Sequence, residues 1–294
     1  MQRLPRAGVS NNRLRPNWRF VKISTVAAAI ILLAGSLSKA QVNGQGNENP
    51  VHPRSDVGSA SYCDPSTFKI AVDIGHTIQA SGATSARGVA EHTFNSILAT
   101  KIAESLRDAG YRNTYLLTAT GTGKLQLQQR AAHANALGVN LFLSIHHDDV
   151  QPIYYSTWEH NGRSYHYSDR FSGYSLFVSY KNRYAKASLT FAKLLGSELL
   201  ARGMQFSLHH AEKIRGEARE VLDSERGIYR YDDLFVLKNT FAPAVLLEAG
   251  VIVNRGEEVI LASPERQNAI SAAVLTATNE FCATNRSNMN PQNR

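Results

Sequence analysis

Three short apolar runs in this chain each end on a residue that can bind a metal ion or assist one. The first run ends at His76, the second at His146 and the third at Glu248. Runs rich in Ile, Val, Leu and Phe are typical of buried strands in a parallel sheet. Because ligands of open α/β sheets gather beyond the carboxyl ends of the strands, we expect these three side chains to share one crevice.

Glu91 is a fourth candidate, because it opens an expected amphipathic helix soon after the first strand. Two histidines and a carboxylate are a ligand set found in catalytic zinc sites, where one coordination position stays open for water. We therefore predict that Zn²⁺ is bound by His76, Glu91 and His146. Glu248 would then be the catalytic residue, free to take and return a proton during hydrolysis.

Each of these residues also has an ordinary alternative role. A histidine after a strand is more often a hydrogen-bonded loop residue than a metal ligand. A carboxylate in the first turn of a helix, such as Glu91, commonly stabilises the helix dipole. Glu248 is the strongest single candidate, since a charge next to a buried strand has few solvated positions unless the strand end opens into a site.

The order of the apolar patterns predicts the fold class. We expect strands at 68–74, 111–118, 141–145, 176–180, 234–236 and 244–248, and helices at 90–109, 125–137, 185–202 and 264–281. This alternation indicates one α/β domain, with a mainly parallel twisted sheet of about six strands and helices on both faces. Between the third and fourth strands, alternating residues around Asn161-Gly162 predict a hairpin insertion at 150–170.

The two ends of the chain differ in character from the part between them. Residues 1–40 combine basic residues with an apolar stretch and end on Ser38-Lys39-Ala40, which predicts a signal peptide. An uncleaved membrane anchor is the alternative. Residues 41–62 have the composition of a flexible linker and residues 283–294 that of a disordered tail, which leaves 63–282 as the catalytic domain. We expect an exported protein, periplasmic or associated with the cell wall, with no stable membrane span after cleavage.

The positive charge of the chain belongs to its leader. The chain has 32 Lys and Arg against 24 Asp and Glu, but seven of the basic residues precede position 41, which leaves 25 against 24. We therefore expect no nucleic-acid partner, because binding of that kind needs a basic patch on the folded domain.

The chain has only two cysteines, Cys63 and Cys282, which bracket the expected domain. An exported protein meets an oxidising compartment and domain termini often lie close together, so a disulfide between them is plausible. Two unrelated thiols remain the alternative. Their spacing does not match a cysteine-based zinc site.

The segments around the four polar residues resemble the motifs of zinc-dependent N-acetylmuramoyl-L-alanine amidases (amidase type 3). These segments are Asp73-Ile-Gly-His76, Glu91, Ser144-Ile-His146 and Leu247-Glu248-Ala-Gly-Val-Ile-Val-Asn254, and the resemblance runs from about residue 68 to 281. It implies cleavage of the bond between muramic acid and the first alanine of peptidoglycan stems. It also implies zinc ligation by His76, Glu91 and His146 and catalysis by Glu248. By family analogy, the activity would serve cell-wall remodelling or daughter-cell separation.

Four further residues are expected to contact substrate: His147, Asp148, Trp158 and Asn254. The hairpin aromatics could stack on sugar rings, although cross-strand packing within the hairpin is an equal alternative. The charged run 215–230 could receive a protein activator, but such a run is usually a solvated surface. The pair His209-His210 is likewise expected in a solvated segment.

Two other functions remain open at this point. The first is a zinc peptidase that cuts within the stem peptide, and the second is a cell-wall binding protein without turnover. Glu248 argues against the second, because a binding module has no use for a carboxylate beside a metal.

Overall fold

The computed structural model describes residues 64–289, all of which lie in one compact unit, Asp56–Arg294. The expected signal peptide (1–40), the linker (41–62) and Cys63 lie outside the described residues.

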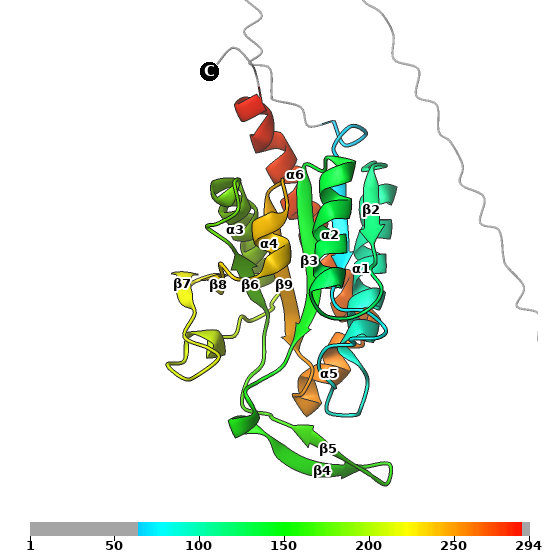
Figure 1. The fold of residues 1–294 in the computed structure, drawn as a ribbon, viewed down its shortest axis with the longest axis vertical. Coiled ribbons are helices and arrows are strands. Elements are labelled where there is room, and N and C mark those ends of the chain that lie inside the picture. Colours follow the sequence, from blue (N-terminus) through cyan, green and yellow to red (C-terminus); the bar gives the residue numbers. More distant parts are fainter. Residues whose placement is uncertain (1–63, 290–294) are drawn as a thin grey trace, which may run out of the picture. The chain divides into compact units, whose positions relative to one another are not determined.

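A seven-stranded sheet in the order β2-β1-β3-β9-β6-β8-β7 forms the centre of this unit (Figure 1). Its strands are β1 (Ile70–Ile74), β2 (Thr114–Leu117), β3 (Leu141–Asp148), β6 (Ser175–Val178), β7 (Glu220–Asp223), β8 (Ile228–Arg230) and β9 (Ala244–Val251). Strands β2, β1, β3 and β9 are mutually parallel, as are β6 and β8, whereas β6 is antiparallel to β9 and β7 to β8. The predicted α/β domain with a mainly parallel sheet is confirmed.

Helices cover both faces of the sheet, as expected. They are α1 (Glu91–Asp108), α2 (Gly123–Leu137), α3 (Ala185–Ala201), α4 (Phe235–Asn239), α5 (Arg255–Leu261) and α6 (Pro264–Met289). The larger apolar cluster joins one face to α1, α3 and α6. The smaller cluster joins the other face to α2 and α4, which lie in front of the sheet in Figure 1.

The positions of apolar residues explain how α1 is oriented. Phe94, Leu98, Ile102 and Leu106 are spaced four residues apart and all are buried, so they form one stripe that faces the sheet. Gly110, at φ +100°, allows the chain to turn away after the helix. This fixed packing brings Glu91, in the first turn, to the carboxyl edge of the sheet.

The hairpin is a separate two-stranded sheet made of β4 (Ser156–His160) and β5 (Arg163–Tyr167). Asn161 at φ +49° and Gly162 at φ +72° form its turn, which matches the prediction from Asn-Gly. In Figure 1 the hairpin lies beyond the carboxyl ends of β3 and β9.

Some short elements differ from the sequence-based expectation. The segment 234–236, predicted as a strand, instead leads into helix α4, because three apolar residues do not distinguish the two periods. Strands β7 and β8 lie within the charged run 215–230, where no strand was predicted, and α5 was not predicted either. The 283–294 tail was predicted to be disordered, but α6 continues to Met289, since no proline or glycine occurs between Pro264 and Pro291.

Cys282 lies near the end of α6 and is disulfide-bonded. Its expected partner, Cys63, lies outside the described residues. Among residues 64–289, none of the helices combines the length and the apolar character needed to cross a membrane.

Candidate metal centre

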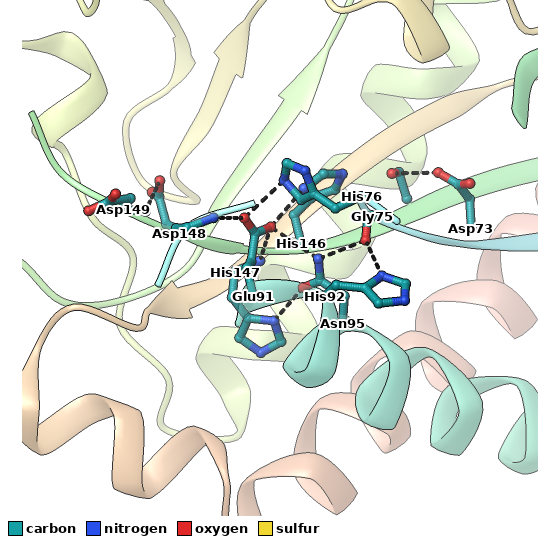
Figure 2. Close-up of polar contacts among 12 residues, drawn as sticks. Asp73, Gly75, His76, Glu91, His92, Asn95, His146, His147, Asp148 and Asp149 are labelled. Carbon is teal, nitrogen blue, oxygen red and sulfur yellow. Dashed lines mark hydrogen bonds and ion pairs between the residues drawn. The ribbon is translucent and has the colours of Figure 1, made fainter. Parts of the chain in front are cut away.

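The structure brings His76, Glu91 and His146 together at the carboxyl edge of the sheet, as the spacing of the motifs predicted. His76 Nε2 lies 2.9 Å from Glu91 Oε2, and His146 Nδ1 lies 3.0 Å from Glu91 Oε1. One ligand atom from each residue lies within 4.8 Å of the other two. Figure 2 shows both imidazoles directed toward the Glu91 carboxylate, so the three side chains surround a common point.

The backbone around His76 is shaped for this convergence. His76 has φ +66°, a left-handed conformation that costs a non-glycine residue about 1–2 kcal/mol. Such outliers are found at functional sites, where the surrounding structure holds them in place. Two glycines leave room for the ligands: a Cβ on Gly75 would lie 2.5 Å from His146 Nε2, and one on Gly82 would lie 2.2 Å from Glu91 Oε2.

Glu91 is buried and held on both carboxylate oxygens. Oε2 accepts from the amide of Ala83 at 3.0 Å, while Oε1 accepts from Asn95 Nδ2 at 3.0 Å and from the amide of His147 at 3.3 Å. Burial alone would raise the pKa of Glu91, but hydrogen bonds from His146 and His76 hold this pKa well below its usual range. Glu91 is therefore an ionised carboxylate held in a fixed position, as a metal ligand would need to be.

A buried ion pair supports His146 from behind. Arg130, on α2, binds Asp73 of β1 and donates to Ser144 Oγ at 3.0 Å, and its Nη2 lies 3.4 Å from His146 Nε2. Burial lowers the pKa of His146, which favours the neutral imidazole that a metal requires. Arg130 and Asn95 were not predicted to serve the site. The position of Asn95 one helical turn after Glu91 was the available signal.

Glu248 lies on β9 directly beside His146 in the register of the two strands. Its Oε2 atom is buried and, among the described residues, has no hydrogen-bond partner. Burial raises the pKa of Glu248 well above its usual range, and the neighbouring carboxylates of Asp148 and Glu91 raise it further. A buried carboxyl group with a raised pKa and an oxygen that makes no hydrogen bond can hold a proton. Glu248 would hold it beside His146 on the neighbouring strand β3.

The three converging residues fit a zinc ion. Zinc accepts imidazole nitrogen and carboxylate oxygen at about 2.0–2.2 Å, so tetrahedral ligands lie roughly 3.4 Å apart. The closest donor pairs, at 2.9 and 3.0 Å, need to open by only a few tenths of an ångström. The His76 side chain is 31 % exposed, against 4 % for Glu91, so the open side of the centre faces solvent next to His76.

Two of the four predicted substrate contacts face the protein interior. His147 Nδ1 is 2.8 Å from Asn95 Oδ1, and its ring packs against Phe94. Burial lowers the pKa of His147 to about 4. Asp148 is buried against His209 and His210.

The other two predicted substrate contacts, Trp158 and Asn254, make hydrogen bonds that stabilise the fold. Trp158 donates from Nε1 to the carbonyl of Ala86 at 2.7 Å, which fastens the hairpin to the loop between β1 and α1. Asn254 caps α5, where its Oδ1 accepts from the amides of Gly256 and Glu257. The substrate roles of all four residues stay predictions.

His209 and His210 differ from the expectation of a solvated segment. They form a short 3₁₀ turn, and their exposed fractions are only 3 % and 8 %. A histidine pair in a charged stretch predicts a solvent-exposed segment. The sequence could not show its burial, because the contact with Asp148 on β3 spans more than sixty positions.

A family model described as N-acetylmuramoyl-L-alanine amidase matches residues 70–280. The chain belongs to this amidase family. The matched segment contains all four predicted polar residues of the centre. No curated protein matches the chain with significance.

Solved structures of amidases share this fold. The N-acetylmuramyl-L-alanine amidase from Mycobacterium smegmatis has 19 % identity and a TM-score of 0.57, over 75 % of this chain and 99 % of that one. The catalytic domain of CwlV from Bacillus (Paenibacillus) polymyxa var. colistinus has 26 % identity and a TM-score of 0.53, over 73 % and 97 %. The CwlD amidase from Clostridioides difficile, solved in complex with the GerS lipoprotein, has 17 % identity and a TM-score of 0.53, over 74 % and 99 %.

Proposed function

We propose that this member of the amidase family is a zinc enzyme that hydrolyses the amide bond between N-acetylmuramic acid and L-alanine in peptidoglycan. One observation carries the zinc part of the proposal: His76, Glu91 and His146 converge with Glu248 beside them on the next strand. Zinc held by these residues would polarise the scissile carbonyl and lower the pKa of a bound water.

Glu248 is proposed as the group that moves the proton. Its free Oε2 can take a proton from the attacking water, since no described residue occupies that oxygen. Burial raises the pKa of Glu248, which makes it a stronger base than an exposed carboxylate and lets it keep the proton for the leaving amine. Glu91 cannot replace it, because both its oxygens are engaged.

The location and partners follow from the same proposal. Peptidoglycan is an extracytoplasmic substrate, so the expected signal peptide and an exported, periplasmic or wall-associated enzyme are consistent with it. A protein activator stays a prediction, supported by one amidase of the same fold that was solved with a lipoprotein.

Product analysis of digested sacculi tests the proposed bond, and matched variants test the roles. Mass spectrometry should find free N-terminal alanine on the released stems and a lactoyl carboxylate on the glycan. His76→Ala should lose zinc and activity together, whereas Glu248→Gln should keep zinc and lose kcat by about 10²–10⁴. An intact muramoyl-alanine bond with shortened stems would indicate the peptidase, and binding without any cleavage would indicate the non-catalytic alternative.

A further inference from the structure

A second cluster of metal-binding side chains lies beside the centre already described. It consists of Asp148, at the end of β3, and the adjacent residues His209 and His210. Asp148 Oδ2 lies 3.2 Å from His209 Nε2 and 2.8 Å from His210 Nε2, and all three residues are buried. In Figure 2 the Asp148 carboxylate is directed away from Glu91, so the two clusters do not share a ligand.

The outer nitrogen of each imidazole in this second cluster is held by another side chain. His210 Nδ1 lies 2.8 Å from Glu217 Oε2, and His209 Nδ1 lies 2.7 Å from Ser207 Oγ. Histidines that bind metals almost always engage their second ring nitrogen in this way, which fixes the tautomer and aims the free nitrogen at the ion. Here His210 Nε2 is hydrogen-bonded to Asp148 Oδ2 at 2.8 Å, and His209 Nε2 lies 3.2 Å from the same oxygen.

Within the described part of the chain, no lysine or arginine balances the carboxylates around this cluster. The side chains of Asp148 and Glu217 are 10 % and 8 % exposed, and within residues 64–289 neither makes an ion pair with lysine or arginine. Buried carboxylates are normally paired or bound to metals. His209 Nε2 is also buried without a hydrogen bond in the described part of the chain, because its approach to Asp148 lacks the geometry of one.

We propose that Asp148, His209 and His210 bind a second divalent transition-metal ion, with Zn²⁺ as the ion that suits two imidazoles and a carboxylate. Such an ion would fasten the segment 207–219 to the end of β3. His210 and Glu217 line a cavity of about 120 Å³ together with Glu248, so the second site lies next to the proposed proton carrier. None of its three residues belongs to the predicted metal centre of His76, Glu91 and His146.

The competing explanation is a metal-free ion network. Burial lowers the pKa of His210, but Asp148 and Glu217 outweigh this effect and raise it to about 9. A protonated His210 would then lie between two carboxylates and balance part of their charge. This network leaves His209 Nε2 unpaired, whereas a bound ion uses it.

Metal content of the full chain separates the two explanations. After saturation with Zn²⁺ and gel filtration, the wild type should hold two ions per chain by mass spectrometry of the metal. His209→Asn should hold one, His76→Ala should also hold one, and the double variant none. His133→Asn, which changes an exposed histidine on α2, is the matched control and should keep two.

A single ion in the wild type that is lost in His76→Ala and kept in His209→Asn would overturn the second site and leave the proposed amidase intact. Two ions per chain in a protein that releases no stem peptides with N-terminal alanine would support the second site and overturn the proposed amidase. Because His209→Asn could fail to fold, anomalous diffraction at the zinc edge from wild-type crystals gives an independent readout. A peak between Asp148 and the two histidines is expected, and a peak at His76 alone would contradict the proposal.

Discussion

At the scale of single residues, the centre depends on the small size of its neighbours as much as on its ligands. Gly82 has φ +77°, and a Cβ there would lie 2.2 Å from Glu91 Oε2 and within 2.7 Å of His76 Nε2. No rotamer change relieves this contact without moving a ligand, because Glu91 is fixed by Ala83 and Asn95. The predicted ligands Glu91 and His76 therefore require glycine at this position, both for space and for the backbone conformation.

Gly82→Ala should abolish tight zinc binding and activity while the protein stays folded. Gly203→Ala is the matched control, since Gly203 has φ +74° with nothing within 4 Å of the added Cβ. Both variants should lose about 1 kcal/mol of stability from left-handed backbone strain, and Gly82→Ala should lose more because its Cβ also clashes with Glu91. Only Gly82→Ala should lose zinc in a competition titration with a chelator, and equal zinc affinity in the two variants would contradict the steric argument.

Sequence motifs were informative for single residues where the chain is regular. His76, His146 and Glu248 follow apolar runs, so their common edge could be predicted from strand patterns alone. The burial of His209 and His210 could not be predicted, because it involves a contact with Asp148 that lies 61 and 62 positions away in the chain. No local pattern encodes that contact.

At the scale of elements, the parallel register of β1, β3 and β9 determines the site. Asp73 of β1 lies beside Ser144 of β3, and two residues further along β3 His146 lies beside Glu248 of β9. The register therefore gathers the polar residues of three strands at one edge of the sheet. Long apolar strands were predicted within a few residues of their ends. Short ones such as β7 and β8 were not, since three or four residues carry too little periodicity and their pairing partners are distant in the chain.

The hairpin β4–β5 is predicted to serve long substrates. Trp158 fastens it to the loop that leads into Glu91, and a Cβ on Gly88 in that loop would lie 2.4 Å from the Tyr165 ring.

A variant in which residues 157–166 are replaced by an Asn-Gly turn, so that Ser156 and Tyr167 are joined directly, should lose more kcat/KM on intact sacculi than on a small muramoyl-peptide. Metal content should stay unchanged. Glu159→Ala, on the exposed face of β4, is the control that should keep both activities. Equal losses on the two substrates would contradict a role of the hairpin in binding long substrates.

At the scale of the whole molecule, buried neutral histidines make the stability of the metal-free protein depend on pH. Burial lowers the pKa of His147 from 6.5 to about 4. The unfolded chain therefore binds a proton at a pH where the folded protein does not. Stability from this group is complete above pH 6.5 and is lost as the pH falls toward 4.

The chelator-treated protein should lose up to about 3 kcal/mol through His147 between these two pH values. His147→Asn should be less stable at neutral pH but should lose less on acidification. Thermal unfolding of both proteins at pH 7.5 and pH 4.5 measures the difference. The same drop in Tm for the wild type and the variant would show that His147 does not carry this dependence.

The sequence by itself determined the class of the fold, the strand ends that carry His76, His146 and Glu248, and the family. It could do so because apolar periodicity and short motifs are local properties of the chain. Only the tertiary structure decided that His147 faces α1, that Asn254 caps a helix and that His209 and His210 meet Asp148. These outcomes depend on which way a side chain points and on contacts between distant segments. Both are settled by packing of the whole domain, because burial of each polar group needs a partner that the local sequence does not specify.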